Sequence, residues 1–322
     1  QRQMCIRDRA GTPASLRWHD MDTSGSGVPV FPAQQGTTVA VGAAGQVGRE
    51  LVATGAVPVT RRDMDLLASP RDLRETALRL FASADTVVNV AAWTAVDAAE
   101  DPVNAAAVEG VNATAPGILA AAAAEVGARF LHVSTDYVFS GVPVRADRPW
   151  QVDDPVDPVN VYGATKAAGE DAVRAHGGTV VRTAWVWSGP HEPGRDFVST
   201  MADLAASGRD PLVVDDQTGR PTRAGDLAAG LMELSRLTGE LPPTLHYTDS
   251  GEPVTWFGFA REVFRLLGQD PDRVGACASG DRPSPARRPA WSVLDLSDWC
   301  RLATAPPPWR DSLREGLSVA GG

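Results

Sequence analysis

A β-prone run, a glycine-rich turn and a helix-forming segment follow one another directly near residue 40. The run is Thr37–Val41, the turn reads Gly42-Ala-Ala-Gly45-Gln46-Val47-Gly48, and residues 49–54 form the helix-prone segment. In such a unit the first glycine makes the turn, the second lets phosphate approach the backbone, and the third lets helix and strand pack closely. The positive helix end then faces the phosphate. We therefore expect a dinucleotide pyrophosphate to contact Gly42, Gly45, Gln46, Val47 and Gly48.

Further strand and helix segments alternate after this unit. Residues 56–60, 85–92 and 129–134 read as strands, and 72–82 and 102–126 read as helices. The run 85–92 is almost continuously apolar, which is typical of a strand in a buried parallel sheet. Repeated strand-then-helix units predict a right-handed, doubly wound α/β fold with a Rossmann-type parallel sheet. We assign residues 37–185 to this dinucleotide-binding domain.

The remainder of the chain divides into a leader and a smaller C-terminal part. A strand at 179–187 precedes a loop at 190–194, helices at 197–206, 226–237 and 255–267, a strand at 211–214 and a last helix from Trp309. We expect residues 186–322 to form mainly a substrate-binding domain, with segments that return to the core. Residues 1–36 mix Gly, Ser, Pro and Arg without a sustained period, and both Met4 and Met21 could be starts. We expect this leader to be a disordered tail or a spurious upstream translation.

The residues after the second strand bear on the choice of cofactor. Arg61 and Arg62 suit a 2′-phosphate on the adenosine ribose and favour NADPH, whereas Asp63 and Asp65 leave NADH open. A solvated charged loop is the alternative reading of this segment. Other residues at strand ends are small or polar, as a bound cofactor requires. The cofactor set therefore also includes Arg61, Arg62, Asp65, Leu66, Ala91, Ala92 and Thr94.

Tyr162 and Lys166 lie four residues apart in a helix-forming segment, so both side chains fall on one helical face. An ammonium beside a phenol favours the phenolate and lowers the pKa of the tyrosine, which makes a recognisable acid catalyst. Of the 30 Lys and Arg residues, Lys166 is the only lysine. Because a planar guanidinium cannot replace a compact ammonium at a crowded site, this lysine favours a functional role. Thr135 and Asp136 follow another strand and should face the same crevice, although Thr135 could instead cap a turn.

Composition excludes several other classes of protein. A net charge of −10 and a pI near 5.0 argue against nucleic acid or an anionic membrane as partner. Three scattered cysteines give no disulfide framework or zinc site and fit a reducing cytoplasm. No apolar run is long enough to span a bilayer. The five histidines lack the spacing of metal ligands or a hydrolase triad, so we expect ordinary core or surface roles and no metal site.

The motifs together resemble those of the extended short-chain dehydrogenase/reductases, over nearly all of residues 37–317. They are Gly42-x-x-Gly-Gln-x-Gly48, Asn89-x-Ala-Ala-x-Thr-x-Val-Asp97, Ser134-Thr-Asp-Tyr-Val-Phe139, Tyr162-Gly-x-x-Lys-x-x-Gly-Glu170, Arg182-Thr-x-Trp185, Asp216-Gln-x-Gly-x-Pro-Thr222 and Arg288-Pro-x-x-Ser-x-Leu-Asp295. The resemblance implies a catalytic trio of Thr135, Tyr162 and Lys166. It also implies a sugar-nucleotide pocket, in which we place Val96, Asp97, Asp136, Tyr137, Trp185 and Gln217.

Within this family the similarity points to the branch that reduces dTDP-bound 4-keto-6-deoxyhexoses. It implies reduction of the C4 ketone of dTDP-4-dehydro-6-deoxy-L-mannose to dTDP-L-rhamnose for cell-surface polysaccharide, with NADPH or NADH. Another nucleotide-sugar reductase or epimerase, and a non-catalytic regulatory subunit on the same fold, are the alternatives. Some relatives bind magnesium through glutamates at a dimer contact. Those glutamates are not matched here, so magnesium and a homodimer stay open.

Overall fold

The computed structural model describes residues 4–7, 13–16, 36–142, 148–190 and 196–318. Its centre is a six-stranded sheet with the strand order β12-β7-β6-β5-β3-β4, and all neighbouring pairs are parallel. The chain first winds outward from β3 to β4 and then returns to β5 on the other side of β3. This reversal is a topological switch point, where such sheets bind their ligands. The strands are β3 (Thr38–Val41), β4 (Val57–Val59), β5 (Thr86–Asn89), β6 (Arg129–Thr135), β7 (Thr179–Thr183) and β12 (Thr244–His246).

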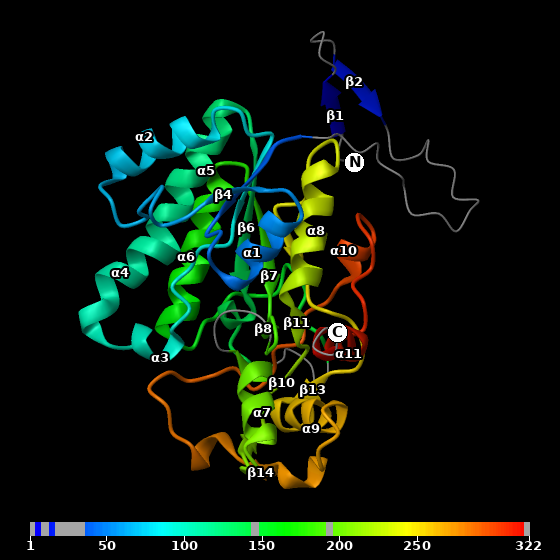
Figure 1. Ribbon diagram of the computed structural model, residues 1–322. Helices are drawn as coiled ribbons and strands as arrows, with labels where there is room; N and C mark the ends of the chain where they lie inside the picture. The colour runs from blue at the N-terminus through cyan, green and yellow to red at the C-terminus, as the bar shows by residue number, and fades with distance from the viewer. Residues whose placement is uncertain (1–3, 8–12, 17–35, 143–147, 191–195, 319–322) are drawn as a thin grey trace.

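Helices cover both faces of this sheet, which confirms the predicted doubly wound α/β fold (Figure 1). In β3, Val39 and Val41 pack beneath α2 on one face, while Ala40 packs with Leu51 of α1 on the other. This alternation is the period of two that a strand imposes on its side chains. The first face carries α2 (Pro70–Phe81), α5 (Ala115–Val126) and α6 (Val161–Ala175). The second carries α1 (Gln46–Ala53), α8 (Ala224–Arg236) and α10 (Ser297–Cys300).

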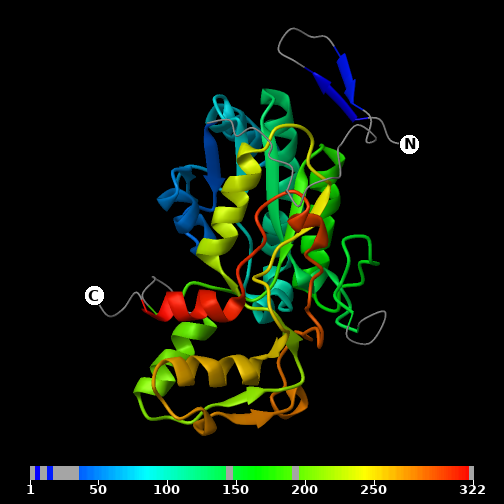
Figure 2. The same ribbon diagram turned by 90° about the vertical axis from the view of Figure 1, so that its right-hand side faces the viewer.

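A second, smaller layer lies below the carboxyl ends of the strands in Figure 2. It contains α7 (Phe197–Ala206), β9 (Leu212–Val214), α9 (Trp256–Leu266), β14 (Gly275–Cys277) and α11 (Trp309–Ser318). Its core is separate and includes Val198, Phe259 and Leu313. Two short pairings lie near the cleft: β8 (Val186–Trp187) with β11 (Thr222–Arg223), and β10 (Thr218–Gly219) with β13 (Val254–Thr255). The domain division at residue 185 remains a prediction.

Two predicted elements are interrupted. The single strand expected at 179–187 stops at Thr183 and resumes at Val186, because Trp185 has a φ of 51°, outside the extended region. The helix expected at 102–126 consists of a 3₁₀ turn (Pro102–Asn104), α4 (Ala105–Glu109), a π turn (Gly110–Thr114) and α5. A π turn inserts an extra residue into a helix and often occurs at functional sites. Here the side chain of Asn112 bonds both backbone groups of Trp93, at 2.8 and 3.2 Å.

The leader and one loop are only partly described. Residues 4–7 (β1) and 13–16 (β2) pair as an antiparallel two-stranded sheet, which among the described residues does not join the central sheet. The expectation of a disordered or spurious leader stays a prediction, since residues 1–3, 8–12 and 17–35 lie outside the described part. Most of the predicted loop at 190–194 also lies outside it. The strand β12 and the helix α10 were not predicted.

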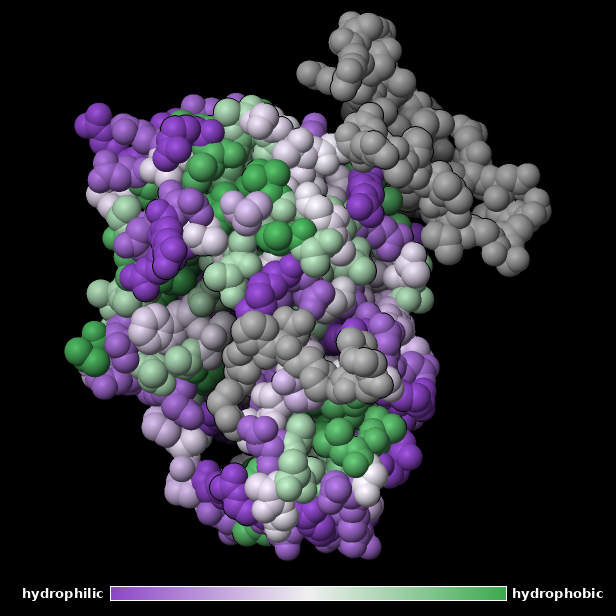
Figure 3. All heavy atoms as spheres, in the orientation of Figure 1, coloured by the Kyte–Doolittle hydropathy of each residue, from purple (hydrophilic) through white to green (hydrophobic). Residues whose placement is uncertain are grey.

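The surface mixes polar and apolar side chains. In the view of Figure 3, hydrophilic residues lie between small apolar areas over most of the described surface. No helix in the described ranges is long and apolar enough to cross a membrane.

Candidate active site

A cleft of about 1150 Å³ opens at the carboxyl ends of the central strands. It brings together segments that are far apart in the sequence and that we predicted to share one site. The predicted residues that line it are Gly42, Gly45, Gln46, Val47, Gly48, Arg61, Asp65, Leu66, Ala91, Ala92, Thr94, Val96, Thr135, Asp136, Tyr137, Tyr162, Lys166 and Trp185. Three predicted site residues, Arg62, Asp97 and Gln217, do not line this cleft.

The glycine loop is shaped for close approach. Gly42 has a φ of 89°, in the left-handed region that favours glycine, and its amide donates to the Val59 carbonyl of the neighbouring strand at 3.0 Å. A Cβ on Gly48 would lie 2.2 Å from the Gly42 carbonyl oxygen, so no other residue fits at that position. The loop and the first turn of α1 line the cleft, and the free N–H groups of a helix N-terminus can bind a pyrophosphate. This cradle fits a dinucleotide.

The charged residues after β4 have two different positions: Arg61 and Asp65 line the cleft, whereas Asp63 bonds within its own turn. Arg61 lines the cleft, and its guanidinium is 3.8 Å from the Asp65 carboxylate, with both side chains mostly exposed. Asp63 accepts hydrogen bonds from the Thr60 amide and hydroxyl, at 2.8 and 2.7 Å, which lower the pKa of its carboxyl. Asp63 therefore holds its own turn and is not directed at a ribose. Of the two arginines, only Arg61 is in place for a 2′-phosphate.

Thr135, Tyr162 and Lys166 meet where β6 ends and α6 begins. Asn160 caps α6 by accepting from the Gly163 amide at 2.7 Å, and this sets the first turn that carries Tyr162. A Cβ on Gly163 would lie 2.1 Å from the Tyr137 carbonyl oxygen, so this glycine lets the helix approach β6 closely. The Thr135 hydroxyl lies within hydrogen-bonding reach of the Tyr162 phenol. Thr135 also caps the next turn by accepting from the Tyr137 amide at 3.2 Å, and its catalytic role stays a prediction.

The pKa of Tyr162 differs from the expectation. Burial raises it to about 12, and the Thr135 hydrogen bond offsets only part of that shift. Lys166 is not among the groups that shift this pKa, and its Nζ contacts residues of β6. Lys166 Nζ donates to the Val133 carbonyl at 2.8 Å and lies 3.0 Å from Nε2 of His132. Burial lowers the pKa of Lys166 itself to about 8. Tyr162 is therefore a phenol at neutral pH.

Asp136 is a second perturbed group in the cleft. Burial raises the pKa of its carboxyl to about 7, although hydrogen bonds from Ser292 and Thr135 oppose that shift. One of its oxygens, Oδ2, has no hydrogen-bond partner among the described residues. A buried acceptor without a partner suits a ligand hydroxyl.

A second cavity of about 730 Å³ adjoins the first and shares Tyr137 and Trp256 with it. Gln217 lines this cavity, and so does Arg288, whose guanidinium is held by the Asp97 carboxylate at 2.9 Å. Asp97 therefore acts behind the cavity wall by orienting an arginine. The remaining polar residues of the wall include Asp216, Ser279, Arg282, Ser284 and Arg287.

Two tryptophans stand at the junction of the cavities. The Trp185 and Trp256 rings stack with centroids 3.7 Å apart and planes 13° apart. Gly219 lies directly beneath Trp185, since a Cβ there would be 2.7 Å from the indole. Trp256 was not predicted, because a tryptophan at the start of a helix gives no local sign of a site.

Other residues that the prediction missed lie behind the cleft. His132 contacts Lys166, and Asn89 contacts His132, although His132 was expected to have only an ordinary core or surface role. The only available signal was a histidine inside an otherwise apolar strand. No group of three or more His, Cys, Asp or Glu that could hold a metal occurs in the described part of the chain.

Comparison with known proteins agrees with this geometry. A family model described as "RmlD substrate binding domain" matches residues 37–320. A dTDP-4-dehydrorhamnose reductase of Mycolicibacterium smegmatis is 42% identical over 289 residues, which cover 88% of this chain and 86% of that protein. The crystal structure of a dTDP-4-dehydrorhamnose reductase from Clostridium acetobutylicum superposes with a TM-score of 0.76 at 34% identity, covering 88% of this chain and 99% of the other. The dTDP-4-dehydrorhamnose reductase of Bacillus anthracis in complex with NADP gives a TM-score of 0.76 at 26% identity, covering 89% and 100%.

Proposed function

The chain belongs to the dTDP-4-dehydrorhamnose reductase family, and from that premise we propose that it uses NADPH to reduce the C4 ketone of dTDP-4-dehydro-6-deoxy-L-mannose. The product is dTDP-L-rhamnose. The observation that carries the proposal is the convergence of Thr135, Tyr162 and Lys166 in one cleft with the glycine loop. A protein that only binds a dinucleotide would need the glycine loop, but it would not need a buried tyrosine and a buried lysine in the same cleft.

Each group of residues has a separate role in the proposed reduction. A bound nicotinamide supplies the hydride for the ketone carbon. Tyr162 is protonated at neutral pH and donates its proton to the developing alkoxide, and the Thr135 hydroxyl donates a hydrogen bond to the same oxygen. Lys166 would hold the nicotinamide ribose. The loop from Gly42 to Gly48 would hold the pyrophosphate, and Arg61 would contact the 2′-phosphate of NADPH.

We place the nucleotide diphosphate of the substrate in the second cavity, where Arg282, Arg287 and Arg288 supply positive charge. The sugar then lies between the two cavities, beside the stacked Trp185 and Trp256 rings. There Asp136 Oδ2 is available to a sugar hydroxyl. This placement sets the ketone near Tyr162.

The test follows the loss of absorbance at 340 nm with residues 37–322, NADPH or NADH, and dTDP-4-dehydro-6-deoxy-L-mannose. Substrate-dependent, stoichiometric oxidation of NADPH with dTDP-L-rhamnose as product is expected. An epimerase would retain its nicotinamide and show no stoichiometric loss. Turnover of a different 4-keto-6-deoxyhexose in place of this substrate would refute the substrate assignment while keeping the reductase.

Tyr162→Phe separates catalysis from binding. Loss of the proton donor should lower kcat by about 10²- to 10⁴-fold, while NADPH still binds. Tyr247→Phe is the matched control, because its hydroxyl donates to the Asp226 carbonyl in the core and does not line the cleft. Turnover by Tyr162→Phe equal to that of Tyr247→Phe would reject the assignment.

A homodimer and a cytoplasmic location complete the proposal. Light scattering of the purified protein measures the first, and fractionation of cells measures the second. Turnover with and without a chelator measures any dependence on magnesium.

A further inference from the structure

The carboxylate of Asp196 joins three segments that surround the cleft. Asp196 precedes α7 in the smaller layer, and its Oδ1 atom caps this helix by accepting from the Ser199 amide at 2.8 Å. Its Oδ2 atom accepts from the amides of Ser188 and Gly189, directly after β8, at 2.7 and 3.0 Å. The same Oδ2 accepts from Nε2 of Gln46 at 3.0 Å, in the glycine loop 150 positions earlier. One side chain of the smaller layer is therefore bonded to the cofactor loop.

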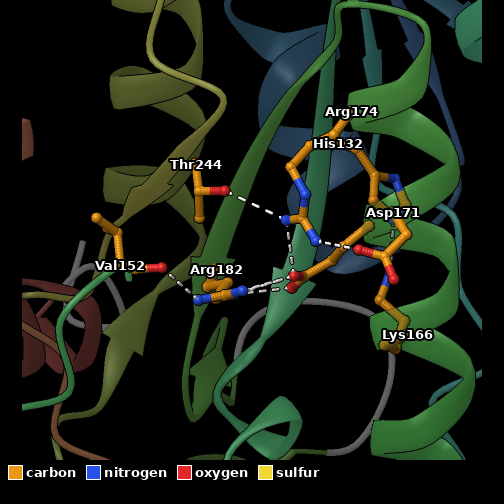
Figure 4. Close-up of polar contacts among 8 residues, drawn as sticks. His132, Val152, Lys166, Asp171, Arg174, Arg182 and Thr244 are labelled. Carbon is orange, nitrogen blue, oxygen red and sulfur yellow. Dashed lines mark hydrogen bonds and ion pairs between the residues drawn. The ribbon is translucent and has the colours of Figure 1, made fainter. Parts of the chain in front are cut away.

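A second carboxylate with several donors, Glu170, shows what is different about Asp196. Glu170 accepts from Arg182 and Arg174, at 2.7 and 3.1 Å (Figure 4). Those three residues belong to α6 and β7, which both lie in the layer of the central sheet. Asp196 instead connects that layer with the smaller one, and its partner in the glycine loop is an uncharged amide.

The helix that Asp196 caps contacts the pair of stacked tryptophans. Phe197 is the first residue of α7, and its ring centroid lies 4.5 Å from that of Trp256. Trp256 in turn stacks on Trp185 at 3.7 Å and lines both cavities. Trp185 comes directly before β8, and the amides that follow β8 donate to the Asp196 carboxylate. Both rings of the stack are thus connected to Asp196, one through α7 and the other through β8.

The side-chain amide of Gln46 suits a position between two anions. A carboxylate can only accept, so the Gln46 atom that faces Asp196 is the nitrogen, which carries two N–H groups. Within the described part of the chain, Asp196 is the one residue that this nitrogen contacts by a hydrogen bond, and Gln46 lines the cleft. Its second N–H is therefore available to a phosphate oxygen at the glycine loop. A glutamate here would bring two carboxylates together, and an apolar side chain would donate to neither anion.

We propose that Gln46 and Asp196 are positioning residues, through which the binding of the dinucleotide and the binding of the sugar nucleotide favour each other. Ordering a flexible glutamine side chain costs conformational entropy. A bound pyrophosphate that accepts from the second N–H orders this side chain, and the first N–H then holds Asp196 and the start of α7. The sugar nucleotide therefore meets a tryptophan stack that is already fixed. By linkage, the sugar nucleotide tightens the binding of the dinucleotide by the same factor.

Calorimetric titration measures this linkage without turnover. The ligand is dTDP-L-rhamnose, which is titrated into the full chain alone and into the full chain saturated with NADPH. A product and a reduced cofactor do not react with each other, so both measurements report binding only. The ratio of the two dissociation constants is the coupling factor. We expect dTDP-L-rhamnose to bind about fivefold more tightly, or better, when NADPH is present.

Three variants test the route of the coupling. Gln46→Met keeps the length of the side chain and removes the donor, so the coupling factor should fall to about 1, which means no linkage. Phe197→Leu keeps the contact of Gln46 with Asp196 but removes the ring that packs on Trp256, so it should lower the factor as well. Ser199→Ala is the matched control. It removes the hydroxyl that accepts from the Asp196 amide at 2.8 Å, leaves the Asp196 carboxylate bonded to Gln46, and should keep the factor of the unmodified protein.

The outcomes separate this proposal from the proposed function, on which it rests for the identity of both ligands. Equal dissociation constants with and without NADPH in the unmodified protein would overturn the coupling. An unaltered factor in Gln46→Met or in Phe197→Leu would overturn it as well. Reductase turnover without linkage would leave the proposed function intact, whereas linkage without turnover would refute the proposed function alone. Absence of dTDP-L-rhamnose binding in both states would overturn both.

Discussion

Glu170 and Arg182 tie the helix that carries Tyr162 and Lys166 to the strand β7. Arg182 donates to both oxygens of the Glu170 carboxylate, at 2.7, 2.9 and 3.2 Å, and the two side chains are 2% and 0% exposed. The guanidinium also lies 5.0 Å from the centre of the Phe139 ring. This pair is thus sequestered from water on every side.

Glu170→Gln keeps the shape of the side chain and removes its charge. The Arg182 guanidinium then remains buried as a cation without a counterion. Removal of one partner from such a buried ion pair lowers the free energy of unfolding by about 3 to 5 kcal/mol. Arg174 offers no compensation, since it is a second cation on the same carboxylate at 3.1 Å. We therefore expect a loss within that range.

Urea unfolding followed by circular dichroism measures this loss from the shift of the midpoint at constant slope. Glu75→Gln is the matched control, because its pair with Arg71 is exposed at 59% and 86% and should cost about 0 to 1 kcal/mol. The double variant Glu170→Leu with Arg182→Met removes both charges and should recover most of the loss. A cost for Glu170→Gln no greater than that of Glu75→Gln would refute the reasoning.

Three other predictions concern the cofactor loop and the pH dependence. Arg61→Ala should raise the KM for NADPH about tenfold with little change for NADH, because one charge-assisted phosphate contact is lost, while Arg62→Ala should leave the ratio of the two cofactors unchanged in steady-state kinetics. Gly48→Ala should abolish NADPH binding and cost about 1 to 3 kcal/mol in a thermal melt, whereas Gly45→Ala, whose Cβ would be 3.4 Å from its nearest neighbour, should be milder. The pKa of Asp136 in the folded state, about 7, is above the ordinary aspartate value of 3.8, so the folded state binds the extra proton and stability falls as pH rises from about 4 to 7. Asp136→Asn should therefore gain stability relative to the unmodified protein at pH 8 but not at pH 4, by at most about 4 kcal/mol, as thermal melts at both pH values would reveal.

The fold could be predicted because its signals are local. The turn from Gly42 to Gly48 requires glycine for reasons that act within a few residues, and the almost continuously apolar run at 85–92 is typical of a strand in a buried parallel sheet. The spacing of Tyr162 and Lys166 likewise needs only a helix to place both on one face. Short stretches of sequence determine such features, so the conformation of these segments does not depend on distant contacts.

Features that depend on contacts across the chain were not predictable in this way. Lys166 Nζ contacts His132 and Val133, which belong to β6, so the spacing within α6 could not reveal these contacts. The role of Asp97 depends on Arg288, which lies 191 positions later. Arg61 and Arg62 are adjacent in sequence, yet only the path of the loop distinguishes the one that lines the cleft.

The break between β7 and β8 shows how such a distant contact can shape the site. A tryptophan at a φ of 51° is strained, because residues other than glycine rarely adopt the left-handed region. The strain lowers the free energy of unfolding by about 1 to 3 kcal/mol. Two distant residues retain it: Trp256 stacks on the indole, and Gly219 leaves room beneath it. If β7 had continued in extended form, residue 185 would have stayed in the sheet and its side chain would have alternated onto a face of the domain. The strained conformation therefore has a structural result. It directs the indole of Trp185 to the junction between the cleft that contains the glycine loop and the second cavity, where we propose that the sugar lies.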